Sequence, residues 1–192
     1  MEEKNKKTGI IILNYLTWEQ TEQCIQSILK EQDEQVNIYV VDNGSKNVNE
    51  LEDTCKKYPV HLIQNKENVG YAAGNNVGIK AAISDGCEYI ILANNDIIFE
   101  KQSIEKMRDF LCENPKYGIV TARIVDVIGR LQMPHFFRQP NWMDIVCTQT
   151  ILRFLTKQRQ KEVYGTQKMY ENNQDLFAAS GCCFMMSRAC AE

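Results

Sequence analysis

The sequence predicts an α/β protein in which helices flank a central, mainly parallel sheet. Short apolar segments of strand length alternate with amphipathic segments of helix length over residues 1–125. The apolar segments are nearly continuous in hydrophobic residues, which is typical of strands that are covered by helices on both faces. Polar residues directly follow four of these segments. Alternation of this kind indicates βαβ units with right-handed crossovers.

The first two strands and the helix between them follow from short patterns. Residues 8–13 (TGIIIL) form one apolar run, and residues 36–41 (VNIYVV) form a second run that ends at the turn sequence DNGS. Between these runs, Thr17 is placed to cap a helix that extends to Lys30 and carries Cys24 and Ile28 on its apolar side.

The alternation continues along the chain. The helix before Asn114 is expected to end there, because Pro115 disfavours the helical conformation of the residue that precedes it. The remaining elements of this half are expected at 48–57 (helix), 60–64 (strand), 72–84 (helix), 89–93 (strand), 103–112 (helix) and 118–122 (strand).

The pattern loosens from Asp126 onward. Residues 130–170 mix proline, aromatic and basic residues and contain one expected helix at 142–157. Strand character returns at 176–187, around a tight Ser180-Gly181. We therefore predict a nucleotide-binding type of half over residues 1–125, with a variable half over 126–192 built onto it.

Composition narrows the class of protein. The chain has 192 residues, of which 44% are hydrophobic and 24% charged, so a sizeable core is expected. A net charge of -3 argues against a broad nucleic-acid binder. The eight cysteines form no CxxC pair and only two histidines accompany them, which favours reduced, mostly buried thiols over a zinc site or a disulfide framework. No signal sequence is visible, so we expect a cytoplasmic protein.

Four of the expected strands end in polar residues. Ligands of open α/β sheets bind beyond the carboxyl ends of the strands, and the side chains at these ends would share one edge. Any one of these segments alone is typical of a turn or a helix cap, whereas four together favour a binding rim. The segments are Asn14-Tyr15, 42–45 (DNGS), 65–70 (NKENVG) and 94–96 (NND).

Two carboxylates in this set carry specific expectations. Asp42 is placed either to cap the turn that follows or to accept a hydrogen bond from an N–H group of a nucleobase. Asp96, held between apolar segments and preceded by Asn94 and Asn95, provides the oxygen ligands that Mg²⁺ or Mn²⁺ prefers, with phosphate oxygens completing the coordination.

Three glycines recur every fourth residue in the segment ENVGYAAGNNVGIKAA. On a helix they share one face, which permits close approach to the sheet or to a ligand. Gly78 is expected to serve helix packing, whereas Gly70 and Gly74, near the start of the helix, are better placed for ligand contact. The segment matches neither the dinucleotide glycine fingerprint nor the phosphate-binding loop of nucleoside triphosphatases.

Taken together, these motifs resemble the family 2 nucleotide-sugar glycosyltransferases, and most closely their bacterial rhamnosyltransferase-like branch, which builds surface polysaccharides. The resemblance covers residues 8–128 and 176–192. It rests on five segments in the family's order, namely NYLTWEQTEQCIQSIL, VVDNGS, ENVGYAAGNNVGIKAA, LANNDIIF and ASGCCFMMSR.

The resemblance implies a Rossmann-like nucleotide-diphospho-sugar transferase fold and an inverting, metal-assisted transfer. The sugar would pass from a UDP- or dTDP-sugar to a polysaccharide or lipid-linked acceptor. Asp96 would meet the metal and the diphosphate, and Asn94 replaces the first acid of the family's DxD-type motif, which removes one charge. The implied donor-binding residues are Asn14, Tyr15, Asp42, Asn68, Gly70, Asn75, Asn94, Asn95 and Asp96.

The resemblance also implies a catalytic base in a segment that would follow Glu192. Residues 1–125 are therefore expected to bind the donor, and 126–192 to form a partial acceptor-side half that ends before the base. Glu192 and Asp175 are weak substitutes for the base, since no motif supports either. A catalytically inactive module that binds a nucleotide sugar or docks to a partner is the alternative, and a nucleotidyltransferase is disfavoured because NYLTWEQ stands in place of a basic, glycine-rich loop.

Residues 136–161 combine aromatic residues, an apolar helix face and several basic side chains. Such a segment is typical of contact with a membrane surface, which would suit a lipid-linked acceptor. An ordinary amphipathic helix with a solvated basic end explains the same pattern.

Overall fold

The structure is a computed structural model that describes residues 7–132, 135–149 and 157–192. The chain forms two compact units. One unit comprises the described residues up to Ala122 together with Gly181–Glu192, and the other comprises Arg123–Ser180. The last twelve residues thus return to the first unit, and the division into functional halves at residue 125 stays a prediction.

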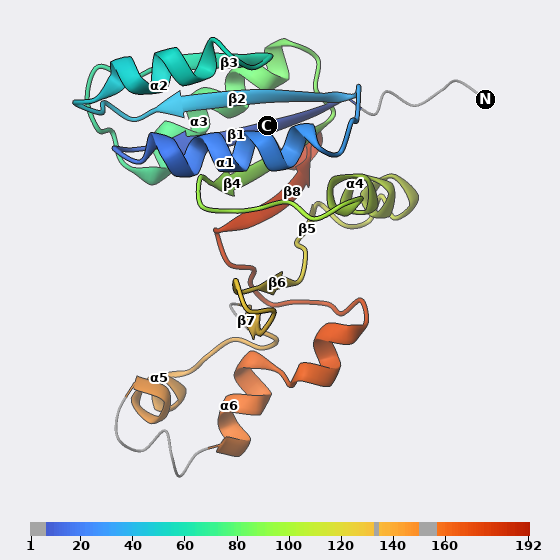
Figure 1. The fold of residues 1–192 in the computed structure, drawn as a ribbon. Coiled ribbons are helices and arrows are strands. Elements are labelled where there is room, and N and C mark those ends of the chain that lie inside the picture. The colour runs from blue at the N-terminus through green and yellow to red at the C-terminus, as the bar shows by residue number, and fades with distance from the viewer. Residues whose placement is uncertain (1–6, 133–134, 150–156) are drawn as a thin grey trace. The chain divides into compact units, whose positions relative to one another are not determined.

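The first unit is built on a six-stranded sheet with the order β3-β2-β1-β4-β8-β5 (Figure 1). The first four of these strands are parallel, and β8 runs antiparallel to both of its neighbours. A mainly parallel sheet is therefore confirmed. The strands are β1 (Thr8–Asn14), β2 (Val36–Asp42), β3 (Val60–Gln64), β4 (Tyr89–Asn94), β5 (Ile119–Val120) and β8 (Cys183–Ser187).

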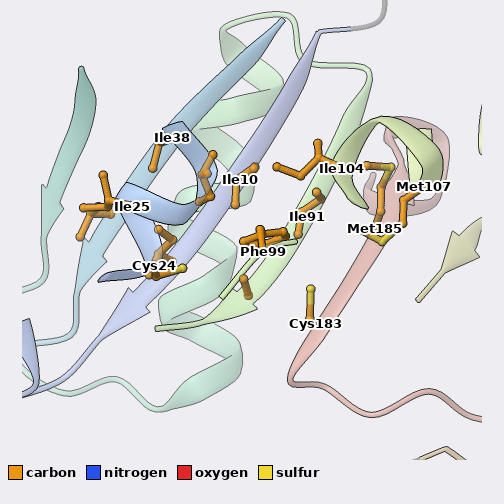
Figure 2. Close-up of a cluster of buried hydrophobic side chains, with 14 of the residues drawn as sticks. Ile10, Cys24, Ile25, Ile38, Ile91, Phe99, Ile104, Met107, Cys183 and Met185 are labelled. Carbon is orange, nitrogen blue, oxygen red and sulfur yellow. The ribbon is translucent and has the colours of Figure 1, made fainter. Parts of the chain in front are cut away.

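Helices cover both faces of this sheet, and alternate residues of β1 pack against the helices on opposite faces. Ile10 and Ile12 belong to a core cluster with side chains of α1, α2 and α4, whereas Ile11 belongs to a second cluster with α3 (Figure 1). Figure 2 shows the first cluster, in which Phe99 and Met185 pack between the sheet and the helices. The helices are α1 (Trp18–Leu29), α2 (Val48–Cys55), α3 (Tyr71–Ser84), α4 (Ser103–Glu113) and α7 (Arg188–Ala191).

The glycines of α3 let this helix lie unusually close to the sheet. A Cβ atom on Gly78 would stand 2.6 Å from Ile11 Cγ2 and 3.0 Å from Val41 Cγ2, both below normal contact distance. The expected packing role of Gly78 is therefore seen. Gly74 has the same role in part, because its Cβ would stand 2.7 Å from Leu13 Cδ1.

Two predicted strands differ from the structure. The strand expected at 118–122 contains only two paired residues, because the Thr121 hydroxyl donates to the Cys183 carbonyl and the chain then leaves the sheet. The strand expected at 176–187 joins the sheet only from Cys183. Its first part forms instead an isolated bridge between Ala178 and Phe136 within the second unit.

Among its described residues, the second unit contains a short hairpin and three helical segments. Of the helices that the structure describes in either unit, none is both long and apolar enough to cross a bilayer. The helix predicted at 142–157 is described as α5 up to Gln149 and as the start of α6 at Lys157, and residues 150–156 lie outside the described residues. The elements are β6 (Ile124–Val125), β7 (Leu131–Gln132), α5 (Trp142–Gln149), α6 (Lys157–Tyr164) and a 3-10 helix (Gln167–Glu171).

Candidate functional site

The carboxyl ends of β1, β2 and β4 meet at one edge of the sheet. In the strand register, Asn14 lies opposite Asp42, and Leu13 lies opposite Asn94. The polar segments predicted to share an edge therefore do share it. A cavity of about 650 Å³ lies elsewhere, between the end of α1 and the first residues of β2 and β3, and none of the predicted site residues lines it.

Asn14, Asp42 and Ser45 form a buried hydrogen-bonded group at this edge. Asn14 Nδ2 donates to Asp42 Oδ1 at 2.8 Å, and both residues are only 1% exposed. The Ser45 hydroxyl donates to Asp42 Oδ1 at 2.6 Å, and the Ser45 backbone N–H donates to Asp42 Oδ2 at 2.9 Å. The bond from the Ser45 N–H makes Asp42 a cap of the turn after β2, which is one of its two predicted roles.

The hydrogen bonds continue from Asn14 through α1 to the end of β4. Thr21 Oγ1 donates to Asn14 Oδ1 at 2.8 Å and accepts from Asn95 Nδ2 at 3.1 Å. Asn95 Nδ2 also donates to Thr17 Oγ1 at 2.7 Å. Thr17 precedes α1 as predicted, but its side chain makes no capping bond to the helix, because it accepts from Asn95 instead. One continuous network therefore links the ends of the three strands.

Asn43 fixes the segment 65–70 against the end of β2. Its Nδ2 donates to Asn68 Oδ1 at 2.9 Å and to the Gly70 carbonyl at 3.3 Å. Its Oδ1 accepts from Asn65 Nδ2 and from the Val69 N–H, both at 3.2 Å. Because Asn43 is 3% exposed, a single buried carboxamide holds an otherwise exposed loop.

The backbone at this edge also adopts conformations that restrict the sequence. Gly44 has a φ of 78°, and a Cβ atom there would stand 2.5 Å from the Glu67 carbonyl carbon. Leu16 has a φ of 65°, in the left-handed region that costs a non-glycine residue about 1 kcal/mol. The Leu16 N–H donates to Ser45 Oγ at 2.9 Å, so the buried group described above holds this strained residue.

Predicted donor-binding residues fall into two sets. Tyr15, Asn68, Gly70 and Asp96 are exposed, and Asn94 and Asn95 are half-buried, so these residues are accessible to a ligand. Asn14, Asp42 and Asn75 are buried and act on their neighbours, with Asn75 Nδ2 donating to the Tyr71 carbonyl at 2.9 Å. Gly70 has open space around it, in contrast to Gly74, which lies against the protein.

Several residues of this edge were not predicted as site residues. Asn43 and Ser45 lie within the DNGS turn that the sequence singles out, and their roles need the fold to be visible. The Tyr71 hydroxyl donates to the Gly181 carbonyl across 110 positions of the sequence, a contact for which the sequence carries no signal. It joins the start of α3 to the segment that enters β8.

The candidate metal site offers a single exposed carboxylate. Across the described residues, no three His, Cys, Asp or Glu side chains converge as they would around a metal held by protein alone. Asp96 projects from the turn after β4 at the shared edge. This arrangement fits Mg²⁺ or Mn²⁺ only in the mode where substrate phosphates and water supply most of the ligands.

Glu192, one of the two weak candidates for the base, lies away from this edge. Glu192 accepts from Arg188 Nε at 2.8 Å, just after β8. Ser187 pairs with Tyr89 at the start of β4, so Glu192 lies near the opposite edge of the sheet. Asp175 belongs to the second unit.

No disulfide joins the cysteines whose side chains the structure describes, and Cys24, Cys55, Cys87 and Cys183 are buried. Burial, with a smaller contribution from Cys182, raises the pKa of the Cys183 thiol to about 12, and burial also raises that of Cys24. Both thiols are therefore protonated and unreactive at neutral pH.

Comparison with known proteins gives this edge its context. The chain matches the family described as Glycosyl transferase family 2 over residues 9–192. The chain belongs to this family. A hexosyltransferase of low-salt glycan biosynthesis, Agl10 from Haloferax volcanii, is 29% identical over 122 residues, which cover 63% of this chain and 38% of that protein. An uncharacterized glycosyltransferase of Rickettsia felis is 34% identical over 111 residues, covering 56% of this chain and 18% of the relative.

Solved structures of other glycosyltransferases share the fold. S. aureus TarS 1-349 in complex with UDP superposes with a TM-score of 0.56 at 20% identity, covering 69% of this chain and 40% of that one. The mannosyltransferase PcManGT from Pyrobaculum calidifontis, in complex with GDP-Man and Mn²⁺, gives 0.52 at 19% identity, covering 62% and 36%. The predicted fold class is thereby confirmed. The family 2 chain thus spans less than half the length of these relatives.

Proposed function

We propose that this family 2 chain binds a nucleotide-diphospho-sugar at the carboxyl ends of β1, β2 and β4 and serves glycosyl transfer from it. The observation that carries the proposal is the continuous network from Asn95 through Thr21 and Asn14 to Asp42. Such a network holds the polar strand ends in one fixed arrangement, as a preorganised binding site requires. Membership of the family supports the reaction class.

The residues of this site have different roles in the proposal. Tyr15 and the loop carrying Asn68 and Gly70 are accessible for contact with the nucleoside and sugar. Asn43 and Asp42 hold this loop and the turn after β2 in place. Asp96 would hold a divalent metal together with the diphosphate, and the metal would neutralise charge on the leaving group.

The finer assignments belong to the same proposal. We place the chain in the rhamnosyltransferase-like branch, with a UDP- or dTDP-sugar as donor and a polysaccharide or lipid-linked acceptor, and with inversion at the transferred sugar. TarS solved with UDP-GlcNAc and PcManGT solved with GDP-Man and Mn²⁺ show that other members of this fold bind such ligands. An acidic base would take the proton from the acceptor hydroxyl.

Calorimetric titration tests the proposal. UDP, dTDP and GDP are titrated with and without Mn²⁺ into the native chain, Asp96→Asn and Asp53→Asn. We expect Mn²⁺ to raise the affinity for one nucleoside diphosphate by about tenfold or more, since the metal bridges Asp96 and the phosphates. Asp96→Asn keeps the shape of the side chain but removes its charge, so the metal effect disappears.

Asp53→Asn provides the matched control, because Asp53 is an exposed acid on α2 that pairs with Lys56 at 2.8 Å. It is expected to behave as the native chain. Absence of binding by all three nucleotides would refute the donor site. Binding that ignores both Mn²⁺ and Asp96 would refute the metal and diphosphate assignment. Binding without turnover of any donor sugar would favour the inactive binding module.

A further inference from the structure

The side chain of Tyr71 links the start of α3 to the segment that enters β8. Its hydroxyl donates to the Gly181 carbonyl, and both residues belong to the first unit. Tyr71 is 47% exposed, so water competes for both groups of this bond. The bond therefore contributes little to overall stability, and its main effect is on the position of the segment that it holds.

The segment that begins at Gly181 is bonded to the turn that carries Asp96. The Cys182 carbonyl accepts from the Asn94 N–H at 2.8 Å. The Asn94 carbonyl accepts from the Ile97 N–H at 3.2 Å, which closes the turn after β4. The position of Asp96 therefore depends on two backbone bonds, and one of them is made to the segment that the tyrosine hydroxyl holds.

The backbone of Tyr71 is fixed independently of its hydroxyl. Asn75 Nδ2 donates to the Tyr71 carbonyl at 2.9 Å, and Asn43 Nδ2 donates to the Gly70 carbonyl at 3.3 Å. A tyrosine side chain has only two rotatable bonds before its ring, so it holds a distant acceptor at a low cost in conformational entropy. The ring therefore reaches Gly181 from a backbone that is anchored by α3 and by the end of β2.

Accurate placement matters for Asp96 because the candidate metal site offers this one exposed carboxylate. A divalent metal in such a site takes its other ligands from phosphates and water. Groups that bind a metal have to be held within about 0.5 Å of the productive geometry, and neighbouring residues supply that restraint. Bonds that hold the turn after β4 thus affect the metal without touching it.

We propose that Tyr71 is a positioning residue for the metal and diphosphate part of the donor site. Its hydroxyl holds the segment 181–182, which in turn bonds Asn94. Asn94 sets the turn from which Asp96 projects. This inference rests on the proposed function, because it assigns Tyr71 a role toward the same metal and diphosphate.

Nucleotide titration of Tyr71→Phe tests this role, because the variant keeps the ring and loses only the hydroxyl. UDP, dTDP and GDP are titrated with and without Mn²⁺. For the nucleoside diphosphate that the native chain binds, we expect the affinity without Mn²⁺ to stay the same. The increase in affinity that Mn²⁺ brings is expected to fall by about threefold or more. In an Asp96→Asn background, Tyr71→Phe should cause no further loss, because both changes act on the same carboxylate.

Tyr58→Phe provides the matched control. Tyr58 also uses its hydroxyl within the first unit, donating to Glu22 Oε1 at 2.9 Å and accepting from Gln26 Nε2 at 2.8 Å. It lines the cavity at the first residues of β2 and β3, away from the donor edge. Its loss should leave the effect of Mn²⁺ unchanged.

Hydrogen exchange gives a second measurement that needs no ligand. The Asn94 and Ile97 N–H groups are bonded in the native chain. In Tyr71→Phe both are expected to exchange faster by about threefold or more, whereas the N–H groups of α4 should exchange at their native rates. Tyr58→Phe should leave the exchange of all these groups unchanged.

The outcomes separate this inference from the proposed function. A full Mn²⁺ effect in Tyr71→Phe, or native exchange of the Asn94 and Ile97 N–H groups, would overturn the positioning role and leave the proposed function intact. A loss of affinity of equal size with and without Mn²⁺ would also overturn it, because the hydroxyl would then serve the nucleotide and not the metal. A native chain that binds none of the nucleotides, or binds them regardless of Mn²⁺, would overturn both.

Discussion

Replacement of Asn43 by alanine tests whether one buried carboxamide organises the loop 65–70 of the donor site. The substitution removes two donated hydrogen bonds, to Asn68 Oδ1 and the Gly70 carbonyl, and two accepted ones, from Asn65 Nδ2 and the Val69 N–H. It leaves the fold of the sheet untouched, because Asn43 lies just beyond the end of β2.

The size of the expected loss in stability depends on how exposed the hydrogen-bond partners of Asn43 are. Each hydrogen bond contributes a net 0.5–1.5 kcal/mol, roughly, when both groups return to water on unfolding. The loop partners are largely exposed and recover water in the variant, which reduces their loss, whereas the site of Asn43 is 3% exposed and becomes a small cavity. We therefore expect the free energy of unfolding to fall by about 2 kcal/mol.

Urea unfolding and nucleotide titration measure the two consequences. With a denaturant dependence of about 2 kcal/mol per molar, the urea midpoint falls by about 1 M. Affinity for the nucleoside diphosphate falls as well, since binding must now order the loop. Asn37→Ala is the matched control, because Asn37 is a half-buried asparagine at the other end of β2 whose amide makes only a 3.4 Å contact, with the Tyr39 hydroxyl. Equal effects of the two substitutions on both measurements would refute the role given to Asn43.

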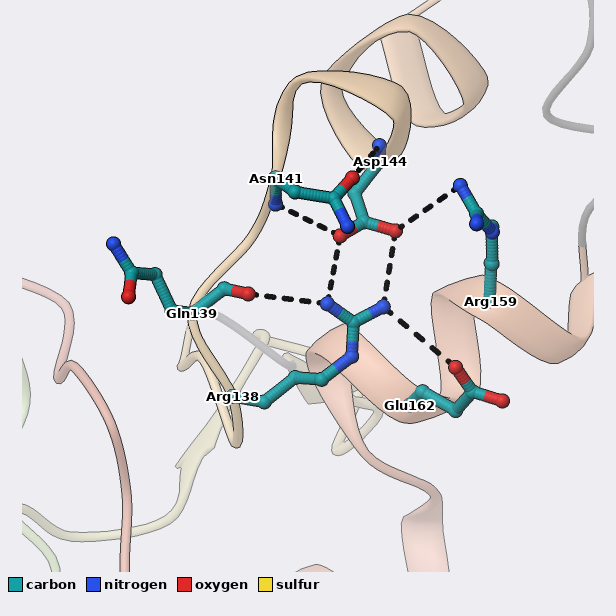
Figure 3. Close-up of polar contacts among 6 residues, drawn as sticks. All are labelled: Arg138, Gln139, Asn141, Asp144, Arg159 and Glu162. Carbon is teal, nitrogen blue, oxygen red and sulfur yellow. Dashed lines mark hydrogen bonds and ion pairs between the residues drawn. The ribbon is translucent and has the colours of Figure 1, made fainter.

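Three further predictions concern packing, titration and buried polarity. Gly78→Ala places a methyl group 2.6 Å from a side chain of β1, so urea unfolding should show a loss of about 1–3 kcal/mol. Arg138 donates to both oxygens of Asp144 (Figure 3) and lowers the pKa of this carboxyl from its usual 3.8 to about 2. The stability that this carboxylate contributes is therefore present above pH 4 and is lost as the pH falls toward 2. Thermal melting followed through the fluorescence of Trp142, the only tryptophan left in the Trp18→Phe variant, measures this loss. Asp42→Asn replaces an acceptor with a donor that faces another donor, and should lower the free energy of unfolding by about 1–3 kcal/mol in urea.

Each of these predictions has a variant that should behave differently. Asn76→Ala, at an exposed position of α3, should leave the free energy of unfolding within about 0.5 kcal/mol of the native value. Asp144→Asn should depend less on pH between 4 and 2 than the native chain does, and an undiminished dependence would contradict the assignment to this carboxylate. Asp53→Asn, which alters an exposed acid, should leave unfolding unchanged, and a loss equal to that of Asp42→Asn would contradict the argument from burial.

The first half of the fold is predictable because each element carries a local pattern. The runs 8–13 and 36–41 lie within β1 and β2, and the glycine spacing anticipates the close contact of Gly78 with the sheet. Strand β8 shows the limit of such patterns. Its sequence is strand-like, but its place between β4 and β5 depends on pairing with residues 90 to 98 positions earlier in β4 and 65 to 67 positions earlier in β5.

The position of the candidate site is predictable from the sequence, but the roles of its individual residues are less predictable. Polar residues at strand ends indicate the correct edge, because parallel strands end together. Their division into exposed and buried residues depends on side-chain packing. Asp42 accepts from the Ser45 N–H and so caps the turn after β2, which is one of its two predicted roles, but its bond from Asn14 of β1 was not predicted. Thr17 accepts from Asn95 instead of capping α1. Such partners come from different strands and helices, so no local pattern encodes them.

The order of the strands has a consequence for how this chain is made. During synthesis, β4 is finished at Asn94, but the strand that pairs with its free edge begins only at Cys183. At 5–20 residues per second, that edge stays open for roughly 4–18 s while the intervening residues are added. An uncovered apolar strand is a template for pairing with other chains. The first unit is therefore most vulnerable to aggregation while the ribosome is still producing the second, and lower translation speed over 95–182 should reduce the soluble yield.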